Sequence, residues 1–106
     1  MIRVSISYPR KDDARFDLDY YINTHMPLVT KLYGDYGLFD WHVDKGISLS
    51  SKVPSNNVVV CYSYFDTLDH VKAAFKKEGT KVMQDVPHFT DIEPVIDFGQ
   101  IHGSAK

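Results

Sequence analysis

The spacing of apolar residues switches along this chain between two periods, and the order of the switches constrains the fold more than any other feature. Segments with the two-residue period of strands and segments with the longer period of helices follow one another as strand, helix, strand, strand, helix, strand. We expect strands over 2–8, 39–47, 58–65 and 95–101, helices over 17–33 and 67–79, and a shorter helical turn over 81–86.

The two expected helices carry recognisable start and stop signals. Asp17 can cap the first helix and Gly34 is placed to end it, while Pro27 removes a backbone donor in the middle and predicts a kink or a broken turn. Thr67 can cap the second helix, and Gly79 is placed to close it. The apolar stripe of the first helix consists of Leu18, Tyr21, Ile22, His25, Val29 and Leu32.

The order of elements predicts an α+β fold, the ferredoxin-like β-α-β-β-α-β unit with a four-stranded antiparallel sheet. Both helices should cover the same face of that sheet, because parallel crossovers are right-handed. A chain of 106 residues has the length of one domain, which we expect to span residues 1–106.

The segment 58–65 is apolar on both sides of its expected strand. The two sets are Val58, Val60, Tyr62 and Tyr64 on one side, and Val59, Cys61 and Phe65 on the other. If the helices cover the first set, the second would leave a sizeable apolar patch in water. Pairing two sheets face to face would bury that patch, so we expect a homodimer that forms a dimeric α+β barrel. A phase shift of one residue exchanges the two sets, and the sequence leaves that choice open.

Charge and hydropathy exclude several classes of protein. A net charge of -2 argues against nucleic-acid binding, which usually needs a basic field. No apolar stretch is long enough to span a bilayer, and the N-terminus turns polar too early for a secretory signal. The single cysteine, Cys61, has no partner for an internal disulfide, so a cytoplasmic location is expected.

His25 is the first candidate for chemistry, because it lies in an apolar stripe close to the backbone disturbance at Pro27. Apolar surroundings lower the pKa of an imidazole and keep it neutral at neutral pH, and a neutral histidine can act as a general base. Its acidic partner would have to come from another element, with Asp85, Glu93 and Asp97 as candidates. The alternative is a packed core histidine that donates to a backbone carbonyl.

Aromatic residues make up 13% of the chain and recur at positions that should face inward. Such side chains can line an apolar pocket and orient a ligand through a few hydroxyls, although they can equally fill a core. The residues that we expect to bind a substrate are Tyr8, Tyr21, Trp41, Tyr62 and Phe89, with Phe75 as a further inward-facing residue.

Other catalytic and metal-binding patterns are not evident. The five histidines are scattered without a zinc-type spacing, so we expect no metal site and no cofactor, with haem or metal ligation by His25 as the open alternative. Cys61 has no cationic neighbour in sequence and is expected to be a buried structural thiol. A glycine-rich phosphate loop and a serine elbow are also missing.

Four stretches of the sequence resemble the EthD-like family of the dimeric α+β barrel superfamily. They are IRVSISYP, RFDLDYYINTHMPLV, VDKG and DVPHFTDIEPVI, and the Tyr-Tyr followed by His-Met-Pro-Leu-Val is the most specific. The resemblance covers nearly the whole chain, and only the polar loop SLSSKVPSNN departs from it. It implies a ferredoxin-like subunit, a sheet-to-sheet dimer, and a cavity between helices and sheet with His25 at the family's histidine position.

The family takes its name from a gene cluster for ether degradation and is often described as oxidoreductase-related. The wider superfamily contains cofactor-independent monooxygenases, polyketide cyclases, muconolactone isomerases and haem enzymes, so fold alone does not fix the activity. We expect a small enzyme, either a cofactor-independent oxygenase or a proton-transfer isomerase, acting on an apolar aromatic or polyketide-like molecule. The alternative is a non-catalytic protein that binds a hydrophobic metabolite or assists a partner oxidoreductase.

Overall fold

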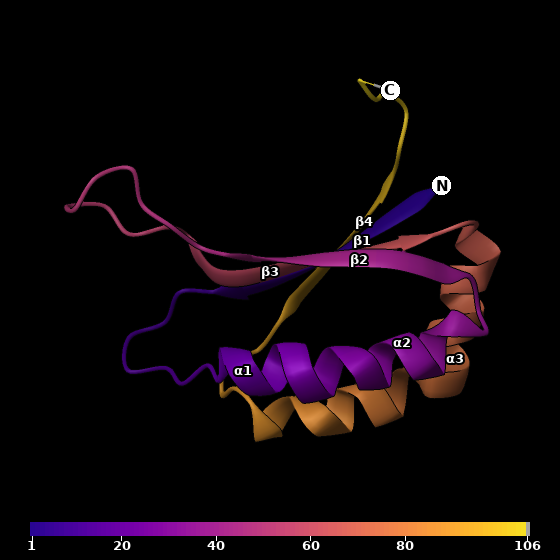
Figure 1. The fold of residues 1–106 in the computed structure, drawn as a ribbon, viewed down its shortest axis with the longest axis horizontal. Helices are drawn as coiled ribbons and strands as arrows, with labels where there is room; N and C mark the ends of the chain where they lie inside the picture. Colours follow the sequence, from indigo (N-terminus) through magenta and orange to yellow (C-terminus); the bar gives the residue numbers. More distant parts are fainter. Residues whose placement is uncertain (106) are drawn as a thin grey trace.

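The computed structural model describes residues 1–105, and they form one sheet with helices packed on one of its faces (Figure 1). The chain is therefore built as two layers, with the second sheet face left uncovered by its own helices. In chain order the elements are β1 (Ile2–Pro9), α1 (Leu18–Tyr20), the π-helical turn η1 (Tyr21–His25), α2 (Met26–Gly34), β2 (Leu38–Lys45), β3 (Asn57–Phe65), α3 (Leu68–Asp85), the 3-10 turn η2 (Val86–His88) and β4 (Val95–Gln100).

The four strands lie in the order β2-β3-β1-β4, and every neighbouring pair is antiparallel. This is the ferredoxin-like arrangement that the sequence predicts, with each helical crossover passing over the same face of the sheet (Figure 1). The α+β fold class, the four strands and the placement of both helical segments are confirmed.

The central strands β1 and β3 divide their side chains cleanly between the two faces. Val4 and Tyr8 of β1 are buried beneath the helices, and so are Val59, Cys61 and Phe65 of β3. The alternate positions on β3 are half-buried and belong to the open face; they are Val58, Val60, Tyr62 and Tyr64. The choice that the sequence left open is therefore decided: Val59, Cys61 and Phe65 face the helices, and a shift of one residue in phase would have reversed every side chain of the strand.

The first helical segment shows the expected disturbance at Pro27, and the break takes the form of a π turn. Asp17 caps the start, since its carboxylate accepts a hydrogen bond from the N–H of Tyr20 at 3.0 Å. The N–H of Met26 then bonds the carbonyl of Tyr21, five residues back. A proline ring collides with the carbonyl four residues before it, and a widened turn just upstream relieves that collision. The wide turn lets both His25 and Met26 face the sheet.

The end of this helical segment differs from the prediction. Gly34 is the last residue of α2 rather than a left-handed cap, and the residue with positive φ is Gly37, at 88°. A Cβ at Gly37 would collide with the side chains of Asp66 and His70, so glycine is required there for close packing as well as for backbone conformation.

The second helix is longer than the sequence suggested. Thr67 caps it as expected, accepting a hydrogen bond from the N–H of His70 at 3.1 Å. Gly79 does not end it, because the buried stripe continues through Val82 to the helix end at Asp85. An interior glycine costs about 1 kcal/mol relative to alanine, which burial of one further apolar side chain offsets.

Candidate functional site

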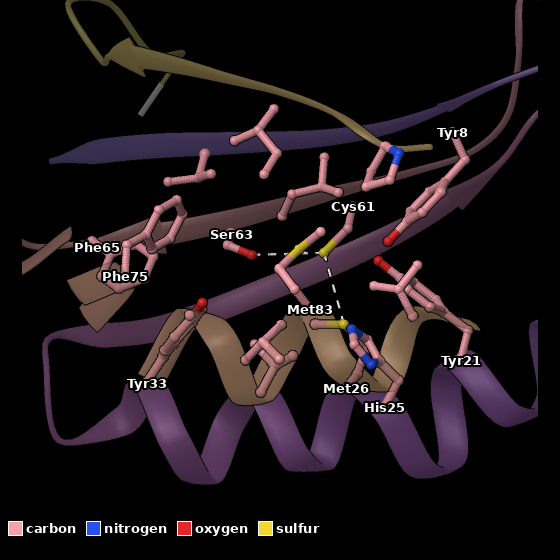
Figure 2. A pocket seen from close by; sticks show the side chains of 18 residues that line it. Tyr8, Tyr21, His25, Met26, Tyr33, Cys61, Ser63, Phe65, Phe75 and Met83 are labelled. Atoms are coloured by element: carbon pink, nitrogen blue, oxygen red, sulfur yellow. Dashed lines mark hydrogen bonds between the residues drawn. The ribbon is translucent and has the colours of Figure 1, made fainter. Parts of the chain in front are cut away.

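A cavity of about 140 Å³ lies between the helices and the sheet. Side chains from β1, β3 and β4 line it on one side, and side chains from η1, α2 and α3 line it on the other (Figure 2). The lining residues are Val4, Ile6, Tyr8, Tyr21, His25, Met26, Val29, Tyr33, Cys61, Ser63, Phe65, Phe75, Gly79, Val82, Met83, Val86, Pro94 and Ile96.

His25 reaches this cavity from the π turn and is bonded from behind by a carboxylate. Its Nδ1 lies 2.9 Å from Oδ2 of Asp85, the last residue of α3, and the two side chains are only 4% and 16% exposed. The backbone carbonyl partner of the core-histidine alternative is therefore replaced by an acidic side chain. Within residues 1–105 no group bonds the other ring nitrogen, Nε2, and Nε2 is not among the fully enclosed atoms that lack a partner. It therefore keeps access to the cavity.

The electrostatics of this pair fix the protonation state of both partners. Burial lowers the pKa of His25, and the hydrogen bond and charge of Asp85 only partly oppose that effect. Burial raises the pKa of Asp85, but hydrogen bonds from His25 and Tyr20 outweigh it and the net pKa is lowered. At neutral pH the pair is a neutral imidazole beside a carboxylate. Because an ionised carboxylate only accepts hydrogen bonds, the proton sits on Nδ1 and Nε2 is a free acceptor.

Asp85 is itself held in place by the start of the first helix. The hydroxyl of Tyr20 donates to Oδ1 of Asp85 at 2.8 Å, so each carboxylate oxygen has one donor. Arg15 donates to the carbonyl of Pro87 at 2.8 Å and also to that of His88, which ties the following turn to the same region. Two hydrogen bonds on a carboxylate fix its plane, and so fix the ring that it holds.

The end of the cavity near His25 carries hydroxyl and sulfur groups. In Figure 2 the hydroxyls of Tyr8 and Tyr21 point toward one another between β1 and η1. Burial raises the pKa of both tyrosines, and it also raises the pKa of the Cys61 thiol. All three groups therefore stay protonated at neutral pH. Cys61 is fully buried and lies 3.6 Å from the hydroxyl of Ser63, which agrees with a structural thiol.

The opposite end of the cavity is aromatic. Phe65 and Phe75 gather there with Tyr33, whose ring stacks on that of Phe75 at 5.6 Å between centroids (Figure 2). Burial and the nearby charge of Glu78 raise the pKa of Tyr33 to about 12. The cavity thus has one end with a base and hydroxyls and another end formed by rings.

The cavity opens to solvent between α3 and β4. Met83 and Ile96 both line it, yet they are 46% and 38% exposed, so they form its rim. Methionine is flexible and adapts its shape to a ligand. An apolar molecule can therefore enter past these two side chains.

The structure brings only some of the expected site residues to the cavity. His25, Tyr8 and Tyr21 line it, and Phe89 packs directly behind His25 with 4.6 Å between ring centroids. Trp41 does not line it, because its Nε1 donates to the hydroxyl of Thr30 at 2.8 Å along the edge of α2.

The expectation that Tyr62 lines the same cavity is wrong. Tyr62 lies on the open face of the sheet, where it packs against His42 at 5.1 Å between ring centroids and below the guanidinium of Arg3. The reason is again the one-residue phase of β3, which puts Cys61 and Ser63 toward the helices and Tyr62 away from them.

Asp85 is the acidic partner that sequence reasoning left open among three candidates. Of the other two, Glu93 is exposed and Asp97 lies on the open sheet face opposite Ser5. Tyr20 was not anticipated at all. The signal available was the helical stripe of α3, which brings Asp85 to the cavity side once the helix runs through Gly79.

Two other properties concern the whole described chain. Across residues 1–105, no three His, Cys, Asp or Glu side chains gather closely enough to hold a metal ion. Of the helices in that range, none has the length and apolar character needed to cross a membrane.

The sequence between residues 9 and 93 matches the EthD domain. The chain belongs to the EthD family. No curated protein matches it. Among solved structures, it is similar to an EthD-like protein of Ralstonia eutropha JMP134, with 30% identity, a TM-score of 0.89, and coverage of 99% of this chain and 96% of that one.

Two further solved structures show how far the fold extends beyond close sequence similarity. An EthD family protein of Bacillus halodurans C-125 is 24% identical, with a TM-score of 0.72 and coverage of 96% of this chain and 99% of that one. A dimeric ferredoxin-like protein of unknown function from Bacteroides fragilis is 12% identical, with a TM-score of 0.52 and coverage of 94% and 95%. At these identities the likeness shows the shared fold.

Proposed function

We propose that this EthD protein is a small proton-transfer enzyme that acts on an apolar aromatic or polyketide-like molecule in the helix–sheet cavity. The observation that carries the proposal is the His25–Asp85 pair, with its free Nε2 at the cavity wall. A neutral imidazole that is oriented by a carboxylate is a competent general base, and the carboxylate stabilises the imidazolium that forms. Asp85 acts through His25 and is a positioning residue.

The proposed step moves one proton from the ligand to His25 and back to the ligand. A C–H or O–H group of the ligand gives its proton to Nε2 of His25, and the ligand becomes an anion that the hydroxyls of Tyr8 and Tyr21 can stabilise by hydrogen bonds. The imidazolium then returns the proton to a different atom of the ligand. Atoms and electrons balance without a further reactant, and the net result is an isomerisation.

A cofactor-independent oxygenation would begin with the same proton transfer. There the ligand anion would react with dioxygen as the second substrate before the proton is returned. Oxygen consumption that depends on both ligand and His25 would support the oxygenase version, whereas a reaction unchanged under nitrogen would support the isomerase version.

Deuterium exchange in heavy water tests the proton transfer directly. We would incubate the protein with a panel of hydroxylated aromatic and β-dicarbonyl compounds and follow the loss of ligand proton signals by NMR. The proposal expects at least one compound to exchange faster than in buffer, with that gain lost in His25→Gln. The matched control is His70→Gln, an exposed histidine also bonded to an aspartate, which should keep the exchange.

The alternative of a non-catalytic binding or accessory protein is favoured slightly by the lack of a second titratable group beside His25 in the sequence. In the structure Asp85 supplies that group from another element. A compound that binds in the cavity with unchanged exchange in wild type and in His25→Gln would favour the binding protein.

We also propose that the chain works as a homodimer paired through its open sheet face, in a cytoplasmic setting that suits the free thiol of Cys61. The support is an uncovered face that carries half-buried Val60 and Tyr62, together with similarity to solved ferredoxin-like proteins that are dimeric. Light scattering should give a dimer for wild type and a monomer for Val60→Asp. A wild-type monomer would contradict the pairing.

A further inference from the structure

The volume of the cavity limits the size of the ligand that it can enclose. Its 140 Å³ is close to the roughly 150 Å³ of an apolar engineered cavity that holds benzene. Part of its lining is fixed by the strand side chains Val4 and Phe65, which are 1% exposed. The enclosed part of a ligand is therefore about one ring or a branched alkyl group of similar size.

The charge of the cavity excludes a class of ligand. Of the 18 residues that line it within the described chain, none is Lys, Arg, Asp or Glu. Two negative charges act on residues that line it: Asp85 bonds His25, and Glu78 raises the pKa of Tyr33. Lys81 of α3 pairs with Glu78 at 3.3 Å and is 67% exposed. A carboxylate or phosphate would lose its hydration here without gaining a cationic partner.

The hydrogen-bonding character of the base selects the polar group of the ligand. Because Asp85 holds the proton on Nδ1, the free Nε2 is an acceptor and requires a donor in the ligand. The hydroxyls of Tyr8 and Tyr21 lie at the same end of the cavity, while Phe65 and Phe75 form the other end (Figure 2). A ligand that carries a donor on an apolar ring matches the acceptor at the His25 end and the apolar lining beside it.

We infer that the cavity takes a neutral one-ring molecule with a hydroxyl at the His25 end, such as a simple phenol, and rejects carboxylates. The inference deepens the proposed function and rests on it only for the reactivity of the bound molecule. The ligand hydroxyl donates to Nε2 of His25, and the ring packs against apolar side chains of the lining such as Met26, Val29 and Val82. Asp85 determines this selectivity without touching the ligand.

Four probe compounds test the size, charge and hydrogen-bonding parts of this inference separately. Each is titrated against the protein, and binding is measured by NMR from the His25 ring nitrogens and the Met26 methyl group. Phenol is the reference. Anisole keeps the ring and loses the donor, and should bind about tenfold more weakly, as expected for one lost hydrogen bond. Benzoate keeps the ring and adds a negative charge, and should bind more weakly than anisole. 2-Naphthol exceeds one ring and should bind more weakly than phenol.

Two variants test whether the selectivity comes from His25. In His25→Phe the ring shape remains and the acceptor is removed, so phenol and anisole should bind equally. The matched control His70→Gln should keep the preference for phenol. Benzoate binding as tightly as phenol, anisole matching phenol in wild type, 2-naphthol exceeding phenol, or no binding of phenol at millimolar concentration would each overturn the inference.

These outcomes are separate from the test of the proposed function. Selective binding of phenol, with no exchange in any compound, would contradict the proposed proton-transfer activity but support the inferred ligand class. Exchange that depends on His25 but occurs with a carboxylate or a two-ring compound would support the proposed activity and contradict the inferred ligand class.

Discussion

Two histidines of this protein bond an aspartate through Nδ1, and the two pairs differ mainly in burial. His70 and Asp66 are 2.6 Å apart and about half exposed, at 50% and 51%. His25 and Asp85 are slightly further apart, at 2.9 Å, but are 4% and 16% exposed. The shorter contact is the one in water, where screening and side-chain entropy reduce its effect. Distance alone therefore does not distinguish a buried pair at a cavity wall from an exposed surface pair.

The two pairs also differ in whether a ligand can reach the second ring nitrogen of the histidine. The His25–Asp85 pair stands at a cavity wall, has a second donor on Asp85 from Tyr20, and leaves Nε2 free. The His70–Asp66 pair sits at the start of α3, where Asp66 also accepts from the N–H of Thr67 and lies against Gly37. It serves the packing of a helix start. Each prediction below changes one pair and uses the other as its control.

The largest expected effect is on exchange activity in His25→Gln compared with His70→Gln. Loss of a general base typically lowers a rate by about 10²- to 10⁴-fold. We expect His25→Gln to fall in that range and His70→Gln to stay within a factor of about two of wild type. Exchange rates in heavy water measure both, and circular dichroism checks that each variant is folded. Equal losses in the two variants would contradict the distinction.

The next effect compares Asp85→Asn with Asp66→Asn. An asparagine amide can donate to Nδ1, which shifts the proton to Nε2 and removes the acceptor from the cavity. We expect exchange by Asp85→Asn to fall by about 10²-fold, less than the loss of His25 itself, with ¹⁵N shifts of His25 that report the exchanged tautomer. Asp66→Asn should change neither quantity. A slower Asp85→Asn with an unchanged His25 tautomer would mean that Asp85 supports the fold only.

Stability should depend on pH through the buried histidine. Burial lowers the pKa of His25 from its ordinary 6.5, so its contribution is complete above pH 6.5 and declines as the pH falls below that value toward the lowered pKa. The slope is at most about 1.4 kcal/mol per pH unit for one proton. Urea unfolding between pH 5 and 7.5 should show this slope in wild type and in His70→Gln, and a flatter one in His25→Gln.

The smallest effect is the response to salt. The hydrogen bond from His70 lowers the pKa of exposed Asp66, and hydrogen bonds from His25 and Tyr20 lower that of Asp85. At about 1 M salt the Debye length is only about 3 Å, so the pKa of Asp66 should rise toward its ordinary value while that of Asp85 changes less. Carboxyl ¹³C titrations at low and high salt measure both, and a larger change at Asp85 would argue against its burial.

Local periodicity was enough to predict the fold, because each element signals itself within a few residues. The alternation in Ile2–Pro9 and the caps at Asp17 and Thr67 all appear in the structure as expected. The errors came where a local signal was overruled by packing. Gly79 looked like a helix end, but the buried stripe of α3 continues past it to Val82.

The site could be predicted only in part. His25, Tyr8 and Tyr21 follow from their places on apolar faces, whereas the phase of β3 misplaced Tyr62. The partner Asp85 is 60 residues from His25 in sequence. No pattern along the chain encodes that distance, since it results from the packing of α3 beside the π turn.

The central claim is that Asp85 and burial keep His25 neutral with its proton on Nδ1 and its acceptor toward the cavity. The most direct test is a ¹⁵N NMR titration of the His25 ring, with His70 observed in the same sample. We predict an Nδ1–H tautomer at neutral pH, a pKa of His25 below 6.5, and a shift of Nε2 when phenol is added. An Nε2–H tautomer, or a pKa of His25 above 6.5, would contradict the account.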